Sequence, residues 1–499
     1  MQIPTSSKTN DWFTCIAFRA ILLSVVFLWP RLVIADISLP KIFSDHMVLQ
    51  QTSEVTIWGK ASPSQEIEIS FNEVTIESVA DADGNWRGII ETPVAGGPYD
   101  LEVKSKDGET KVIFTDVMVG EVWICSGQSN MEWPITKSLN PDTEIDNSKE
   151  FSDLRLFTVK PNATPETLED FSKTKGWDVC SPESVADFSA VAYFFARELK
   201  RELKVPVGLI HTSWGGTRCE AWISGKALQD QPSLAPLLQH WQENDDPTSK
   251  HRPSSLYNGM IYPLKGVQFR GFIWYQGEAN VGRGHQYQTL FPTLIADWRE
   301  QLSNPEAPFY FAQLAPYRYT KHPPEALPEI WDAQLKTWQS VSNTGMAVTN
   351  DIGNLENIHP KNKQEVGRRL ALWALAKTYE NSIEGDPIVP SGPVFDSLQP
   401  IAGSNKIELT FEYAEGLKVV GDQPLNCFTI CGEDKVFVPA KAEIIDDKIF
   451  VFADEVASPV AVRFAWTDTS EPNLVNGAGL PPSAFRTDDY PLLSLEVTH

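Results

Sequence analysis

The sequence lacks several features that would assign it to a common class of protein. None of its six cysteines has the paired spacing of metal ligands, so the sequence predicts no metal site. Beyond an N-terminal segment, no apolar run is long enough to cross a membrane. There is no repeat of solenoid length and no low-complexity tract. With 499 residues the chain is too long for one core, so we expect an ordered protein of several domains.

Basic residues are scarce relative to acidic ones. The chain has 42 Lys and Arg residues against 66 Asp and Glu residues, a net charge of −24. A field of this sign repels the phosphate groups of nucleic acids. We therefore expect no nucleic-acid partner.

Residues 1–35 have the pattern of an export signal. Lys8 and Arg19 precede the apolar run AILLSVVFLWP (20–30), and the segment ends at Ala35. The run is too short for a membrane span but suits the core of a signal peptide. We expect cleavage after Ala35, with export to the periplasm or outside the cell (lysosomal or secreted in a eukaryote) and no stable membrane insertion. An uncleaved anchor is the alternative.

The remaining chain divides into three regions. Residues 36–117 contain short alternating β runs, which predict an antiparallel β-sandwich. Residues 118–384 alternate apolar strands with amphipathic helices, which predict a parallel sheet between two helical layers. A Pro- and Gly-rich linker (385–395) begins a second β region, which runs over 385–499. In the middle region the predicted strands are 118–124, 205–211, 268–275, 308–314 and 345–350, and the predicted helices are 188–203, 288–302, 328–341 and 363–379.

Residues suited to nucleophilic catalysis follow two of the predicted strands, at the edge where ligands bind in parallel sheets. Ser129 follows the first strand at a turn, where free N–H groups and a helix dipole would favour a developing anion. His359 precedes Pro360 after the last strand, with Asp351 and Glu356 just upstream, so it can serve as a general base. The alternatives are an N-cap serine and a structural histidine. No Gly-x-Ser-x-Gly elbow lies near a strand, which argues against the α/β-hydrolase arrangement.

Glycines and amides follow two further strands. Gly215 and Gly216, in HTSWGGTRCEAW (211–222), allow close approach of the backbone to a ligand. Asn280, in YQGEANVG (275–282), has an amide that can donate a hydrogen bond to an oxyanion. Ordinary turn chemistry would also explain both stretches.

Together these stretches resemble a known family. The resemblance rests on IFSDHMVLQ, VWICSGQSNMEWP, SWGGTRCEAWIS, WYQGEAN, IHPKNKQEVGRRLALWALA and GLPPSAFRTDD, which span nearly the whole chain after residue 42. These motifs are similar to those of the sialate O-acetylesterases, a family of SGNH-type (GDSL-like) carbohydrate esterases. The resemblance implies an SGNH-type three-layer α/β/α sandwich with a parallel sheet, flanked by N- and C-terminal antiparallel β domains.

The resemblance also implies roles for individual residues. Ser129 matches the nucleophile and His359 the base. The oxyanion hole would be formed by the Ser129 N–H, the N–H of Gly215 or else Gly216, and the Asn280 amide. No metal or organic cofactor is implied.

The acid departs from the family pattern. Glu356 stands three residues before His359, where many SGNH enzymes have Asp. Sialate esterases often carry Asp two residues before the histidine, where this chain has Asn357. Asp351 is a rival for the role, and a Ser129–His359 pair with only loose acidic support is a third possibility.

The expected function is removal of acetyl groups from the hydroxyls of an O-acetylated carbohydrate through an acetyl-serine. The alternatives are an acetylxylan or other polysaccharide deacetylase on the same scaffold, and a non-catalytic glycan-binding protein, which the unusual acid would favour. Candidate substrate contacts are Gln128, Arg218, Glu220, Gln276 and Glu278, although Arg218 and Glu220 could instead form a buried ion pair. The sequence leaves the sugar and the oligomeric state open.

Overall fold

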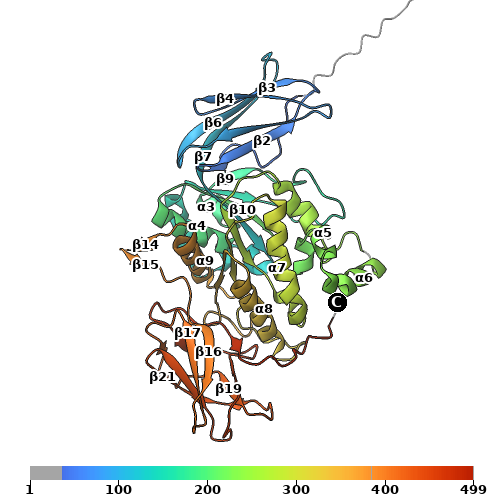
Figure 1. Cartoon of the computed structure of the whole chain (residues 1–499). Coiled ribbons are helices and arrows are strands. Elements are labelled where there is room, and N and C mark those ends of the chain that lie inside the picture. Colours follow the sequence, from blue (N-terminus) through green and yellow to red (C-terminus); the bar gives the residue numbers. More distant parts are fainter. Residues whose placement is uncertain (1–35, 245, 384, 498–499) are drawn as a thin grey trace, which may run out of the picture. The chain divides into compact units, whose positions relative to one another are not determined.

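The computed structural model describes residues 36–244, 246–383 and 385–497 (Figure 1). The export signal predicted for residues 1–35 lies outside this range. Among the described residues, no helix is long and apolar enough to cross a membrane. The five described cysteines are free thiols: Cys125, Cys180, Cys219, Cys427 and Cys431.

A mostly parallel sheet forms the middle of the chain. Its strand order is β13-β12-β11-β7-β10-β8-β9, and only the β8–β9 pairing is antiparallel. All residues of β10 and β11 are buried, as expected of strands covered on both faces. The bounds are β7 (Lys111–Gly127), β8 (Leu154–Thr158), β9 (Trp177–Val179), β10 (Val207–Ser213), β11 (Gly271–Tyr275), β12 (Phe309–Ala312) and β13 (Thr344–Ala347).

Two pairs of helices form the outer layers (Figure 1). Helix α4 (Ala190–Leu203) packs against α9 (Lys363–Trp373), and α7 (Gly284–Gln301) packs against α8 (Ala326–Ser340). All four lie where the helical periodicity predicts them, except that α9 passes into a π-helical turn at Ala374–Thr378. The predicted α/β/α sandwich is therefore confirmed.

Strands β8 and β9 were not predicted from the sequence. β8 is only five residues long and contains Arg155, so it has neither a long apolar run nor a regular alternation. The structure satisfies this charge with Asp116, whose carboxylate lies 3.1 Å from the guanidinium. A short strand whose charge is compensated from another element cannot be found from local pattern alone.

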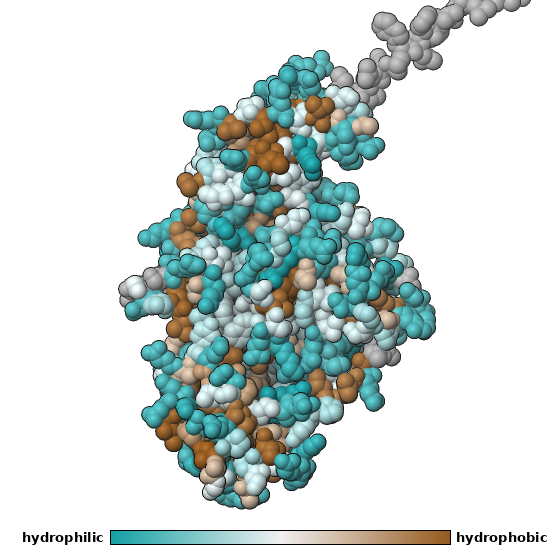
Figure 2. Space-filling model, in the orientation of Figure 1, coloured by the Kyte–Doolittle hydropathy of each residue, from teal (hydrophilic) through white to brown (hydrophobic). Residues whose placement is uncertain are grey.

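The N-terminal β region follows its sequence pattern closely. Strands β4-β3-β6-β7 form an antiparallel array, and β2 pairs with β5. Burial alternates along β5 as expected of a sheet with one solvent face, and Figure 2 shows exposed apolar residues over this region. Large exposed apolar side chains here include Val74, Val79, Ile89 and Ile113. The strands are β1 (Val48–Gln50), β2 (Glu54–Lys60), β3 (Glu66–Phe71), β4 (Val74–Val79), β5 (Asn85–Glu91) and β6 (Gly96–Ser105).

Strand β7 belongs to both of these sheets. Its residues 111–119 pair with β6 in antiparallel fashion, whereas residues 121–127 pair with β10 and β11 in parallel. One continuous strand thus runs through the domain boundary predicted at 117. The predicted boundaries at 117 and 384 stay predictions.

The C-terminal region returns to antiparallel β structure. Its two main sheets have the strand orders β16-β17-β22-β21 and β20-β19-β23-β25. The ring of Phe395 in the first sheet stacks on the ring of Phe485 in the second, with ring centroids 4.8 Å apart. The main strands are β16 (Val394–Pro400), β17 (Lys406–Glu412), β19 (Phe428–Cys431), β20 (Val438–Pro439), β21 (Lys441–Ile445), β22 (Lys448–Phe452), β23 (Ala461–Phe464) and β25 (Phe485–Arg486).

The late motif GLPPSAFRTDD contacts the carboxyl edge of the central sheet. Ser483 accepts a hydrogen bond from the Gln313 amide, and the Pro482 carbonyl accepts one from the Asn350 amide, both at 2.7 Å. Gln313 directly follows β12, and Asn350 comes three residues after β13. The motif therefore helps to fix the loops that follow these two strands.

Candidate active site

The turn that carries Ser129 depends on Gly127. Gly127 has φ +143°, and a Cβ there would lie 2.2 Å from the Tyr275 carbonyl oxygen of the adjacent strand. That oxygen accepts the Gln128 N–H at 3.0 Å. Ser129 is then the first residue of α1, where helix geometry leaves its N–H without an intrahelical acceptor.

His359 lies against Ser129. Its Nε2 is 2.8 Å from the Ser129 Oγ, and its ring stacks on Trp133 with centroids 4.6 Å apart and planes 17° apart. Burial lowers the pKa of His359 from its usual value of 6.5, and the positive charges of Lys363 and Lys137 lower it further. The imidazole is therefore neutral at pH 7, the state that can accept the Ser129 proton.

The Lys137 charge gives a test of this arrangement. The ammonium lies 5.3 Å from the Trp133 ring centroid, on the residue that stacks on His359. Because protonated His359 cannot act as a base, activity falls as the pH drops through the His359 pKa. Lys137→Met removes a positive charge and raises that pKa, so the acid limb of kcat/KM for p-nitrophenyl acetate should move to higher pH. The exposed Lys265→Met is the control, and a shift to lower pH would contradict the assignment.

Neither predicted acid is brought to His359. The Glu356 side chain is 76% exposed and pairs with Arg318. Asp351 binds Arg369 through both carboxylate oxygens at 2.6 Å. Within the described part of the chain, the only hydrogen bonds of His359 are those to Ser129 and, through its backbone N–H, to the side chain of Asn357. The geometry favours the Ser–His pair that the sequence left as the third possibility.

This difference predicts weak effects of the acidic residues on turnover. Glu356→Gln is expected to change kcat by less than about threefold, whereas loss of an orienting acid from a Ser-His-Asp triad costs ~10⁴-fold. Asp351→Asn should act through stability, since it leaves the buried Arg369 with Glu365 as its remaining ion-pair partner. Steady-state kinetics with a melting curve for each variant separates the two effects. A loss near the triad value for Glu356→Gln would restore that residue as the acid.

A buried polar network lies behind Ser129. The Asn130 amide donates to Glu278 at 2.5 Å and to the Ile358 carbonyl at 3.0 Å, and its oxygen accepts from the Lys363 ammonium at 2.5 Å. Burial lowers the pKa of Lys363 to about 7 and raises the pKa of Glu278. Glu278, a predicted substrate contact, therefore binds Asn130, the residue next to the nucleophile. Lys363 gave no signal in the sequence because lysine is seldom buried.

Gly215 lies beside Ser129 with its N–H already engaged. A Cβ on Gly215 would be 3.2 Å from the Ser129 Cβ, so the predicted oxyanion donor is close to the nucleophile. Its N–H, however, donates to the Glu132 carboxylate at 2.7 Å. Gly216 is exposed and adopts the left-handed backbone conformation, with φ +72°. Glu132 was not singled out in the sequence, although it belongs to the same motif as Ser129.

Three predicted polar contacts are buried as structural amides. Asn280, a predicted oxyanion donor, is fully buried; its amide donates to Glu220, and its oxygen accepts from the Cys219 N–H at 3.0 Å and from Gln276 at 2.7 Å. Gln276 is also fully buried, and Gln128 is 2% exposed. The side-chain oxygen of Gln128 accepts hydrogen bonds from two backbone N–H groups of the loop after β11, those of residues 277 and 279. These amides join the loops after β7, β10 and β11.

Arg218 and Glu220 do not form the ion pair considered above. Glu220 is fully buried and pairs with Arg283 at 2.9 Å. Burial would raise the pKa of Glu220, but Arg283, a backbone N–H, Arg218 and Asn280 hold that pKa below its usual value. Arg218 is half-buried, and among the described residues no carboxylate lies within ion-pair distance of it, although the charge of Glu220 acts on it from farther away.

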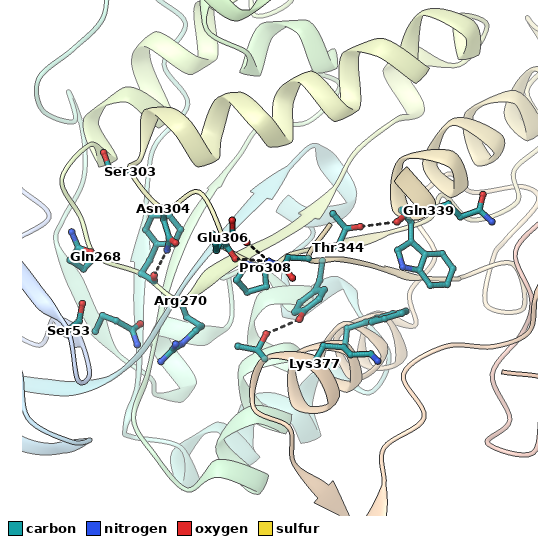
Figure 3. A pocket seen from close by; sticks show the side chains of 18 of the residues that line it. Ser53, Gln268, Arg270, Ser303, Asn304, Glu306, Pro308, Gln339, Thr344 and Lys377 are labelled. Carbon is teal, nitrogen blue, oxygen red and sulfur yellow. Dashed lines mark hydrogen bonds between the residues drawn. The ribbon is translucent and has the colours of Figure 1, made fainter. Parts of the chain in front are cut away.

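A large cavity lies at the opposite edge of the sheet (Figure 3). Its volume is about 1000 Å³, and its lining includes Arg270, Pro308 and Thr344, at or beside the starts of β11, β12 and β13. Ser129 follows the end of β7, so this cavity is separate from the Ser129–His359 pair.

Comparison with known proteins first gives the class of the molecule. A carbohydrate acetylesterase from Xanthomonas citri has a similar structure, with a TM-score of 0.83 and 34% identity, covering 91% of this chain and 100% of that one. The sialate O-acetylesterase of Homo sapiens is 29% identical over 461 residues, covering 85% of this chain and 86% of the human protein, and that of Mus musculus is 27% identical over 480 residues. The fold and these similarities define a carbohydrate esterase.

The family model described as "Carbohydrate esterase, sialic acid-specific acetylesterase" matches residues 119–376, more than half of the chain. The chain belongs to this family, as the sequence motifs predicted.

Proposed function

We propose that this protein is an exported sialate O-acetylesterase that removes acetyl groups from the hydroxyls of O-acetylated sialic acids through an acetyl-enzyme on Ser129. Membership of the family and the two mammalian relatives support the substrate class. The observation that carries the mechanism is the 2.8 Å contact between His359 Nε2 and Ser129 Oγ at the carboxyl edge of the sheet.

The first half-reaction forms the ester on the enzyme. Ser129 Oγ attacks the acetyl carbonyl carbon while His359 Nε2 takes the hydroxyl proton. The tetrahedral intermediate then collapses, the bond to the sugar oxygen breaks, and His359 returns the proton to that oxygen. Stacking on Trp133 holds the imidazole in place, a task that an acidic residue performs in a triad.

The second half-reaction releases acetate. A water molecule attacks the acetyl carbon, His359 takes its proton, and the proton returns to Ser129 Oγ as the ester bond breaks. In both halves the negative charge develops beside the Ser129 and Gly215 N–H groups. Glu132 must leave the Gly215 N–H before that group can stabilise the oxyanion.

Acetate release from a panel of acetylated glycans tests the proposal. The proposal predicts turnover of O-acetylated sialic acids above that of acetylxylan. The reverse preference would favour the polysaccharide deacetylase, and no turnover of these substrates or of p-nitrophenyl acetate would favour the glycan-binding alternative. N-terminal sequencing of the secreted protein tests the export signal, with Asp36 as the expected first residue.

A further inference from the structure

Lys250 contacts the Gly215–Gly216 turn next to the nucleophile, and Arg218 follows that turn by two residues. Lys250, from the segment after α6 (Ala235–Glu243), donates a hydrogen bond to the Gly215 carbonyl oxygen at 2.6 Å. Its ammonium also lies 5.6 Å from the centroid of the Trp214 ring. Arg218 extends from the same loop as the turn, and both cations are half-buried.

The distances place this charge within reach of a substrate bound at Ser129. Because a Cβ on Gly215 would lie 3.2 Å from the Ser129 Cβ, and Lys250 binds the carbonyl of Gly215, the ammonium lies within about 10 Å of the nucleophile. In an acidic sugar, the carboxylate and the hydroxyls are only a few bonds apart. One sugar molecule can therefore place its carboxylate at this ammonium and an O-acetyl group at Ser129.

These cations have no carboxylate partner in the described part of the chain. Glu220, the acidic residue nearest in sequence to Arg218, is bound to Arg283, and Glu132 is bound to the Gly215 N–H. The negative charge of Glu220 acts on Arg218 only from beyond ion-pair distance, because its carboxylate is bound to Arg283. A partly buried cation without a close carboxylate costs free energy.

His251 adds a polar group to the same place. His251 directly follows Lys250 in the chain. Burial lowers its pKa, the positive charges of Arg218, Lys250 and Arg283 lower it further, and the charge of Glu220 opposes them. Its Nδ1 is buried and has no hydrogen-bond partner among the described residues. A buried polar atom of this kind is usually satisfied by a ligand or by water.

We propose that Lys250 and Arg218 form a subsite for the carboxylate of an acidic sugar, holding the sugar so that its O-acetyl group reaches Ser129. The inference rests on the proposed function and adds the residues that select the substrate. The guanidinium can grip both carboxylate oxygens, and the ammonium supplies a second charge. Neutral acetylated sugars would leave both cations unpaired.

The test compares an O-acetylated N-acetylneuraminic acid with its C1 methyl ester, which has the same acetyl group but no negative charge. In wild-type protein, kcat/KM should be greater for the acid. Lys250→Met and Arg218→Met should each lower the ratio of kcat/KM for the acid to that for the ester by roughly 10- to 100-fold, the value of a charged hydrogen bond. The exposed Lys265→Met is the matched charge control and should leave the ratio unchanged. An unchanged ratio in both subsite variants would overturn the proposal.

A binding measurement separates this inference from the proposed function. Calorimetric titration of Ser129→Ala protein with N-acetylneuraminic acid needs no turnover. Binding that is weakened at least tenfold by Lys250→Met supports the subsite even if no ester is hydrolysed. Equal affinity with and without Lys250 contradicts it even if the esterase is active.

Discussion

Replacement of Ser129 by alanine is expected to lower kcat for p-nitrophenyl acetate by at least ~10³-fold. The reason is geometric, since Ser129 Oγ is the nucleophile candidate that lies 2.8 Å from the neutral imidazole of His359. Removing the hydroxyl leaves only oxyanion stabilisation and binding to accelerate attack by water. Initial-rate kinetics at pH 7, corrected for spontaneous hydrolysis, measures the loss.

A matched serine makes the result specific. Ser340, at the end of α8, is exposed, and its hydroxyl donates to the Lys336 carbonyl of its own helix. Ser340→Ala should keep full activity. Retention of more than about a tenth of the activity in Ser129→Ala, in a protein with an unchanged melting curve, would exclude the acetyl-serine route.

Replacement of Glu220 by alanine is expected to lower the free energy of unfolding of the α/β region by ~3–5 kcal/mol. Glu220 is fully buried, pairs with Arg283 at 2.9 Å and accepts from Asn280 at 3.1 Å. The substitution leaves the side chain of Arg283, which is 6% exposed, without its carboxylate partner. Urea denaturation measures the change, and activity should fall with it because Asn280 holds the loop after β10.

Two further variants show whether the cost comes from the unpaired charge. Glu220→Leu combined with Arg283→Met removes both charges and should recover part of the lost stability, since a buried ion pair can be replaced by apolar side chains. Asp454→Ala breaks an exposed pair with Lys441 and should cause no measurable change. A double variant less stable than Glu220→Ala would contradict the explanation.

The sequence predicted the parts of the fold that depend on local pattern. Strands buried on both faces and helices with one apolar face were found because periodicity is a property of consecutive residues. β8 was missed because its Arg155 is acceptable only when Asp116 lies beside it. The continuity of β7 through two sheets was also missed, since pairing partners are not visible in one strand.

The candidate site divides in the same way. Ser129 and His359 could be placed together because each follows a strand of one parallel sheet, and such strand ends share an edge. The acid could not be predicted, because in the sequence Glu356 and Asp351 look like possible triad acids. Only the structure shows that Arg318 and Arg369 bind their carboxylates instead. Asn280 illustrates the same limit, because an amide that binds an oxyanion and an amide that joins two loops look alike in sequence.

Trapping of the acetyl-enzyme shows whether Ser129 is the nucleophile. Protein mixed rapidly with p-nitrophenyl acetate and quenched in acid can be digested and analysed by peptide mass spectrometry. The acetyl-serine mechanism predicts one acetyl group on the peptide that contains Ser129, at the Ser129 hydroxyl, and none on that peptide in Ser129→Ala. Turnover without acetylation of Ser129, or acetylation at another residue that turns over at the catalytic rate, would contradict it.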